Sequence, residues 1–320
     1  MVIGTARLSQ FHCTPAGGGN PIRIMALNSS LRSVNGGKAA VFLESIKFSH
    51  SVFALPFAII AMVLAARGWP GAWAVFWIVV ACVGARTAAM AFNRVADAEF
   101  DARNPRTAGR AMVTGALSRE FMMGALIVSS LTFFIAAAML NSTCLYLAPP
   151  VLAILFAYSY AKRVTDLSHF ILGFALGLAP IGAWLAIRES VTLTPLLLSL
   201  AVICWVAGFD MIYSCQDVDV DRAEKELHSL PKRLGVAGAL SIARKTHVAA
   251  LIFFALFWIA ADLGVLSGLG IIAIGALLEH QHRLVRPDDL SRVDAAFFTT
   301  NGIISVGFMI IVLIDMFVFP

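Results

Sequence analysis

Residues 70–101 read PGAWAVFWIVVACVGARTAAMAFNRVADAEFD, an apolar run that ends in a cluster of acidic residues. The apolar part, 70–92, is long enough to cross a bilayer as a helix, which needs about 20 residues. The pattern recurs where the apolar run 194–215 leads into Gln216-Asp217-Val218-Asp219-Val220-Asp221. A carboxylate at membrane depth costs about 2.5–3.5 kcal/mol on insertion scales. Several carboxylates gathered at two such places therefore require a compensating partner.

The composition of the whole chain is that of a membrane protein. Of its 320 residues, 59% are hydrophobic and 13% are charged, whereas a soluble domain carries about 25% charged residues. We therefore predict an all-α polytopic membrane protein and exclude a large soluble helical protein. Nine apolar segments are expected, at 48–66, 70–92, 121–140, 145–162, 168–187, 194–215, 246–263, 265–282 and 298–318.

The first part of the chain differs from the rest. Residues 1–38 are rich in Gly, Ser, Asn and Pro and lack a long apolar core, which predicts a disordered tail ahead of one transmembrane domain at 39–320. Within that domain, the glycines of the fifth segment favour close contact with a neighbouring helix. These glycines are Gly173, Gly177 and Gly182.

The basic residues predict the orientation. Of the 24 Lys and Arg residues, 21 lie in the N-terminal region or in the joins that follow even-numbered segments. The positive-inside rule then places the N-terminus and these joins in the cytoplasm, in a bacterial inner membrane. Both acidic clusters fall on that side, as a shared site requires. Because the basic residues are spread over loops, the net charge of +5 is no sign of a nucleic-acid partner.

The acidic residues have helical spacing. Asn93, Asp97 and Asp101 are four residues apart, which keeps them on one face of a helix. We expect the same of the second cluster, where the residues that share a face are Asp210, Tyr213, Asp217 and Asp221. Clustered carboxylates repel one another unless a cation lies between them. Oxygen ligands suit Mg²⁺, which is often completed by phosphate oxygens. The pattern thus indicates a membrane-embedded enzyme that acts on a diphosphate ester.

Basic side chains follow each cluster. Those that we expect to hold a diphosphate are Arg106, Arg110, Lys162 and Arg163, because arginine can grip phosphate with two parallel hydrogen bonds. Arg86 lies within segment 70–92, on the face of Asn93. An intramembrane arginine is a functional candidate, and we expect it to pair with a substrate carboxylate or with Asp210.

These residues together resemble the UbiA superfamily of intramembrane prenyltransferases, in particular its 4-hydroxybenzoate polyprenyltransferase-like members. The resemblance covers residues 40–320 and rests on Asn93-x-x-x-Asp97-x-x-x-Asp101, on Arg106-Thr107-Ala108-Gly109-Arg110, on Lys162-Arg163 and on Asp210-x-x-Tyr213-x-x-x-Asp217-x-x-x-Asp221. It implies a nine-helix bundle with a central cavity open to the cytoplasm and to lipid. The implied partners are a polyprenyl diphosphate, an aromatic acceptor and the bilayer.

The resemblance also implies roles for the residues. Asp97, Asp101, Asp217 and Asp221 would be catalytic and would hold Mg²⁺. The leaving diphosphate would be bound by Asn93, Arg106, Arg110, Lys162, Arg163 and Tyr213, and the acceptor by Arg86, Lys47 and Asp210. Transfer to a 4-hydroxybenzoate-like ring would serve quinone biosynthesis.

Two alternatives stay open at this point. The acceptor could instead be a menaquinone precursor of the futalosine route, dihydroxynaphthoate, haem or a glycerol phosphate lipid. The chain could also be a non-enzymatic transporter, although transporters place charges near the midplane of the membrane, whereas the acidic residues here lie at segment ends.

Overall fold

The computed structural model describes residues 37–47 and 53–318, and every regular element in these ranges is helical. Seven spans are long and apolar enough to cross a membrane, which confirms an all-α membrane protein. They lie at Ala72–Ala96, Arg119–Leu140, Ser142–Ala161, Ser168–Arg188, Leu193–Ala223, Leu230–Ala260 and Ala295–Val318. The tail predicted at 1–38 lies outside the described residues except for its last two positions.

Two further apolar segments expected from the sequence are not among these seven spans. The segment expected at 48–66 contains the shorter helix α3 (Leu55–Ala66), and its first residues lie outside the described part. The segment expected at 265–282 is α11 (Val265–Leu284), which is long enough to span but is not among the seven. The count of nine transmembrane helices therefore stays a prediction.

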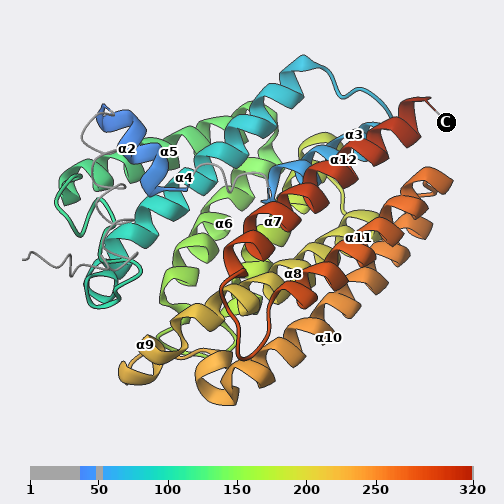
Figure 1. Cartoon of the computed structure of the whole chain (residues 1–320). Coiled ribbons are helices and arrows are strands. Elements are labelled where there is room, and N and C mark those ends of the chain that lie inside the picture. The colour runs from blue at the N-terminus through green and yellow to red at the C-terminus, as the bar shows by residue number, and fades with distance from the viewer. Residues whose placement is uncertain (1–36, 48–52, 319–320) are drawn as a thin grey trace, which may run out of the picture.

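All the helices, α3 and α11 included, form one bundle (Figure 1). The others are α2 (Lys38–Ser45), α4 (Ala72–Arg103), α5 (Arg119–Leu140), α6 (Ser142–Ala161), α7 (Ser168–Arg188), α8 (Leu193–Ser214), α9 (Val218–Ala223), α10 (Leu230–Ala260) and α12 (Asn301–Val318). A π-helical turn at Ala295–Thr300 leads into α12. The short helices α2 and α9 lie at the end of the bundle away from the C-terminus (Figure 1).

The centre of the bundle is aromatic. Trp205 of α8 is fully buried, and rings from other elements surround it, including Phe57 of α3. Its indole N–H donates a hydrogen bond to the Oδ1 atom of Asn301, at 3.1 Å. A buried tryptophan needs such a partner for its polar end. This core fixes α8 between its neighbours α7 and α10, and thereby fixes where the second acidic cluster emerges.

Local sequence signals set several helix ends. Ser118 caps α5 by accepting a hydrogen bond from the Phe121 amide, and Asn141 caps α6 in the same way. Such caps satisfy amide groups that have no partner within the helix. The segment expected at 246–263 was too short, because α10 begins at Leu230. The first turns of α10 carry Lys232 and Arg233, and the helix has a break at Gly235, where φ is +71°.

The glycines of α7 have different surroundings. A Cβ atom at Gly173 would collide with the carbonyl oxygen of Ile203 on α8, and one at Gly177 would press on Ser199. Here the expected close packing is confirmed. Gly182 has open space instead, so the same expectation was wrong for that residue.

Candidate functional site

The first acidic cluster lies on the last turns of α4, which runs as one helix through Arg103. The side-chain amide nitrogen of Asn93 donates a hydrogen bond to the Asp97 carboxylate at 2.7 Å. On its other side, Asp97 accepts a hydrogen bond from Arg163 at 3.2 Å. The same guanidinium nitrogen donates to the carbonyl oxygen of Ala96 at 2.6 Å. The helical spacing thus brings Asn93 and Asp97 together, and the loop after α6 supplies their positive partner.

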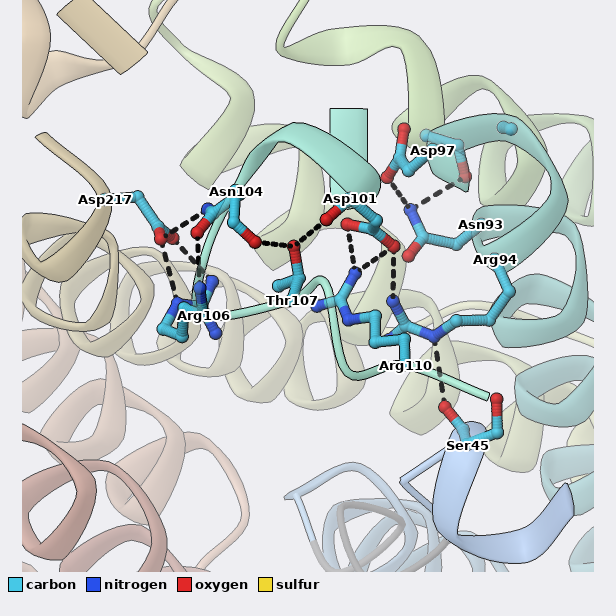
Figure 2. Close-up of polar contacts among 12 residues, drawn as sticks. Ser45, Asn93, Arg94, Asp97, Asp101, Asn104, Arg106, Thr107, Arg110 and Asp217 are labelled. Carbon is cyan, nitrogen blue, oxygen red and sulfur yellow. Dashed lines mark hydrogen bonds and ion pairs between the residues drawn. The ribbon is translucent and has the colours of Figure 1, made fainter. Parts of the chain in front are cut away.

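Asp101, one turn further along, is held by two arginines (Figure 2). Arg110 donates hydrogen bonds to both carboxylate oxygens, and Arg94 lies 3.6 Å away. Arg94 is buried, and its Nε donates to the carbonyl oxygen of Ser45 at 3.0 Å. Arg94 therefore joins α2 to the cluster. Arg94 was predicted only as one of the basic residues that set the topology, although its position next to Asn93, ahead of the helix end, was a usable signal.

The second cluster does not lie on one continuous helix face, which corrects the sequence expectation. α8 ends at Ser214, a 3₁₀ turn covers Cys215–Asp217, and α9 begins at Val218. A 3₁₀ turn has three residues per turn, whereas an α-helix has about 3.6. The turn therefore rotates Asp217 and Asp221 about the helix axis relative to Asp210 and Tyr213, which lie before it. Spacing alone could not reveal this interruption.

Asp217 is bound by residues that follow α4 in the chain (Figure 2). Arg106 grips its two oxygens with hydrogen bonds of 2.8 and 2.6 Å. Asn104 donates to the same carboxylate at 2.9 Å, a contact that the sequence analysis missed. Arg106 also donates to the Tyr213 hydroxyl at 3.0 Å. The loop after the first cluster is thus anchored directly on the second cluster, more than 100 residues away in sequence.

Asp221 is buried, as Asp217 is. The Ser229 hydroxyl donates to it at 2.7 Å and also accepts the amide N–H of Lys232 at the start of α10. The beginning of α10 and the second cluster therefore share one side chain.

All these residues line one cavity of about 1000 Å³. Every site residue that the sequence singled out is in its wall: Lys47, Arg86, Asn93, Asp97, Asp101, Arg106, Arg110, Lys162, Arg163, Asp210, Tyr213, Asp217 and Asp221. The structure thus brings together segments that are far apart in the chain.

The charges of the cavity wall balance. Seven basic side chains line it, Lys47, Arg86, Arg94, Arg106, Arg110, Lys162 and Arg163, and so do seven acidic ones, Glu44, Asp97, Asp101, Asp210, Asp217, Asp221 and Glu224. A diphosphate brings up to three further negative charges. Because unpaired charge in a poorly solvated site is costly, the site needs added positive charge to take such a ligand.

Burial and neighbouring charges shift the pKa of three of the basic groups. Burial lowers the pKa of Lys47; Glu44 opposes this, and Arg94 and two further arginines add to it. For Lys162, burial acts in the same direction, but the carboxylates around the cavity, Asp210 first among them, raise its pKa overall. Burial is also outweighed at Arg106, whose pKa is raised by the hydrogen bonds and charge of Asp217. Lys162 and Arg106 are therefore held as cations.

The residues expected to bind an acceptor have other partners than anticipated. Arg86 donates to the carbonyl oxygen of Lys47 at 3.5 Å, and its buried Nε has no partner among the described residues. The expected pairing of Arg86 with Asp210 is not made. Asp210 is 2.7 Å from Nδ1 of His169 instead. His169 was missed, because a single histidine at the start of an apolar segment carries no distinctive spacing.

Known proteins resemble this chain in sequence and in fold. A family model described as UbiA prenyltransferase family matches residues 54–303. Proteins named 4-hydroxybenzoate octaprenyltransferase are similar over most of the chain. The one from Yersinia pseudotuberculosis serotype IB is 30% identical over 249 residues, covering 78% of this chain and 86% of the relative. The one from Pectobacterium atrosepticum is 29% identical over 75% of this chain and 82% of the relative.

Solved structures give the same result. The structure of a UbiA homolog from Aeropyrum pernix K1 is 32% identical, with a TM-score of 0.72 over 84% of this chain and 97% of that one. A UbiA homolog from Archaeoglobus fulgidus bound to DMAPP and Mg²⁺ has a TM-score of 0.68 over 86% and 98% of the two chains. At 17% identity, the second likeness shows the fold alone.

Proposed function

This chain belongs to the UbiA prenyltransferase family, and we propose that it transfers a polyprenyl group from a prenyl diphosphate to a 4-hydroxybenzoate-like aromatic acceptor, with Mg²⁺ as cofactor. It is an integral membrane protein. We place the reaction at the cytoplasmic side of a bacterial inner membrane, because the basic loops that close the cavity follow the positive-inside pattern. The names of the relatives at about 30% identity support this acceptor class.

A single observation carries the proposal. Two acidic clusters, one at the end of α4 and one from α8 to α9, line one cavity whose wall holds seven acidic and seven basic side chains in all. Such a wall can bind a polyanion and divalent cations at the same time, whereas either partner alone would leave it with excess charge. A transporter has no need of this combination at helix ends.

The wall fits Mg²⁺ by its chemistry. The described residues contain no group of three or more His, Cys, Asp or Glu side chains arranged to hold a metal by themselves. Mg²⁺ is typically bound through one or two carboxylates, with water and substrate phosphates as further ligands. The carboxylates that would hold it are Asp97 and Asp101 on one side and Asp217 and Asp221 on the other. When bound there, Mg²⁺ would neutralise the leaving diphosphate as a Lewis acid.

The basic residues of the chain act on the diphosphate. Arg106, Arg110, Lys162 and Arg163 bind its oxygens, which requires the three arginines to exchange a carboxylate partner for phosphate. The allylic carbon–oxygen bond breaks, and its electron pair leaves with the diphosphate. An electron-rich ring carbon of the acceptor then forms the new bond to the allylic carbon. The ring proton at that carbon passes to an oxygen of the departing diphosphate.

The other walls of the cavity hold the organic groups. Leu172, Leu176 and Phe209 line it and provide an apolar surface for the prenyl chain. They also exclude water, which would otherwise trap the allylic cation. Arg86 and Lys47 would hold the carboxylate of the acceptor, and Asp210 would lie near its hydroxyl.

The test is an assay of the purified full-length protein in detergent. Farnesyl and longer diphosphates are supplied with a panel of aromatic and lipid acceptors, and products are identified by mass spectrometry. We expect prenylated 4-hydroxybenzoate to form with Mg²⁺ and not in excess EDTA. Product from another acceptor only, or equal turnover in EDTA, would refute the acceptor or the cofactor, respectively.

A further inference from the structure

A histidine–carboxylate pair lies behind the wall of the cavity, where Asp210 is the member that lines it. His169, the second residue of α7, is fully buried, and its Nδ1 atom is 2.7 Å from Oδ2 of Asp210 on α8. Its other ring nitrogen, Nε2, is buried and has no hydrogen-bond partner within the described ranges. Asp210 lines the cavity and has a side-chain exposure of 16%. His169 therefore reaches the cavity only through Asp210.

The geometry assigns a direction to this hydrogen bond. A carboxylate can only accept hydrogen bonds when ionised, so Nδ1 of His169 carries the proton and donates it. Because Nε2 has no partner, the interaction with Asp210 is what orients the ring. In return, the histidine fixes one carboxylate oxygen and holds the plane of the Asp210 side chain.

Among the described residues, the hydrogen bond from His169 is the one that Asp210 makes, so its second oxygen accepts none from them. Phe209 beside it in the wall is apolar. Lys162 and Tyr158 lie close enough for the charge of Asp210 to act on them, but neither forms a hydrogen bond with it. The second oxygen therefore has a cation in its neighbourhood and no hydrogen bond, which a donor on a ligand can supply. The matching ligand group is a neutral hydroxyl, since another carboxylate would be repelled.

We propose that His169 is a positioning residue that holds the Asp210 carboxylate so that it accepts a hydrogen bond from the hydroxyl of the aromatic acceptor. The pair thereby selects hydroxylated rings over rings in which this hydroxyl is alkylated. This inference rests on the proposed function, because it concerns the acceptor end of that same cavity. Sites built to bind a substrate hydroxyl reject analogues that lack it much more strongly than sites that only fill space.

A matched pair of variants tests the histidine. His169→Asn keeps a side-chain N–H near the place of Nδ1, whereas His169→Leu keeps the volume and removes the donor. For His169→Leu we expect the KM for 4-hydroxybenzoate to rise about tenfold or more, the loss typical of a hydrogen bond to a charged group. The KM for the prenyl diphosphate should stay within about twofold. His169→Asn should restore most of the affinity for the acceptor.

An analogue tests the selectivity. In wild-type protein, 4-methoxybenzoate should inhibit with a Ki at least about tenfold above the KM for 4-hydroxybenzoate. Asp210→Asn should reduce this preference to about threefold or less, because an amide can donate to the ether oxygen. This arm does not depend on whether His169→Leu folds. The thermal shift that each variant shows with prenyl diphosphate and Mg²⁺ reports that its donor end is intact.

Several outcomes would overturn the inference. One is an unchanged KM for the acceptor in His169→Leu. Another is an equal rise in the KM for both substrates, which would mean that the pair serves the diphosphate end through Lys162. Retention of the hydroxyl preference in Asp210→Asn would have the same consequence. If wild-type protein binds the prenyl diphosphate but prenylates no aromatic ring, the proposed function itself fails, and this inference fails with it.

Discussion

At the scale of single residues, the site is a set of carboxylates and the donors that hold them. Each carboxylate of the clusters already has a donor within the protein: Arg163 for Asp97, Arg110 for Asp101, Arg106 for Asp217 and Ser229 for Asp221. These contacts keep the buried charges stable before any ligand arrives, because an unpaired buried charge is strongly destabilising. They also place the basic side chains beside the carboxylates that we propose to hold the metal.

The two-oxygen grip of Arg106 on Asp217 leads to the first prediction. Arg106→Lys keeps the positive charge but loses the planar fork. We expect the KM for the prenyl diphosphate to rise about tenfold, because at least one charge-assisted hydrogen bond is lost. Steady-state kinetics with varied donor concentration measure this. Arg103→Lys is the matched control, since Arg103 is exposed and pairs with Glu224; a similar rise in both variants would contradict a specific role for Arg106.

At the scale of helices, two close contacts position the clusters. The first is the approach of α7 to α8 at Gly173, where no side chain fits. The second is Ser229, which caps α10 and holds Asp221. Both set where the ends of the helices lie, and so both bear on the cavity.

Gly173→Ala should loosen the α7–α8 contact. Overpacking of this kind costs about 1–3 kcal/mol, so we expect a lower melting temperature in detergent. Intrinsic tryptophan fluorescence measures this melting temperature. Gly182→Ala on the same helix is the control, because its site is open. Alanine favours a helix over glycine, so this variant should melt at or above the wild-type temperature. Equal melting of all three proteins would show that the close approach is unimportant.

Ser229→Ala removes a helix cap and a donor to Asp221 together. The cap alone is worth about 0.5–2 kcal/mol, and leaving the buried Asp221 oxygen without its donor adds to the loss. We expect a lower melting temperature and a lower kcat. Ser118→Ala is the control, since Ser118 caps α5 through an exposed contact and should affect stability only. The prediction fails if the two variants keep the same turnover.

At the scale of the whole molecule, the cavity joins two halves of the chain. Arg106 follows α4, whereas Asp217 follows α8, and their ion pair closes the wall between them. A ligand that bridges both clusters therefore binds the folded bundle and not the separated halves. Such binding stabilises the native state by mass action.

The melting temperature should accordingly depend on donor and metal together. At about 100 times the dissociation constant, a ligand stabilises the folded state by about 2.7 kcal/mol. We expect a clear upward shift with prenyl diphosphate plus Mg²⁺ and a much smaller one with either alone. Asp97→Asn and Asp217→Asn should each abolish the combined effect. A full shift in either variant would mean that the ligand is not shared between the clusters.

The sequence by itself determined the class of fold and the membership of the site. Long apolar runs can only be satisfied in a membrane as helices, because a helix pairs its own backbone groups. Charged residues at the ends of such runs are few and costly, so they point to function. Together with the resemblance, this allowed residues as distant as Lys47 and Asp221 to be assigned to one site before the shape of the cavity was known.

Tertiary structure alone decided the partners. The 3₁₀ turn after Ser214, the buried link from Arg94 to Ser45, and the pairing of Asp210 with His169 in place of Arg86 depend on how helices approach one another. Periodicity gives the face on which a side chain lies, but not the distance to a residue on another helix. That distance is set by packing in the core, such as the contact of Gly173 with Ile203 and the buried ring of Trp205 against Phe57.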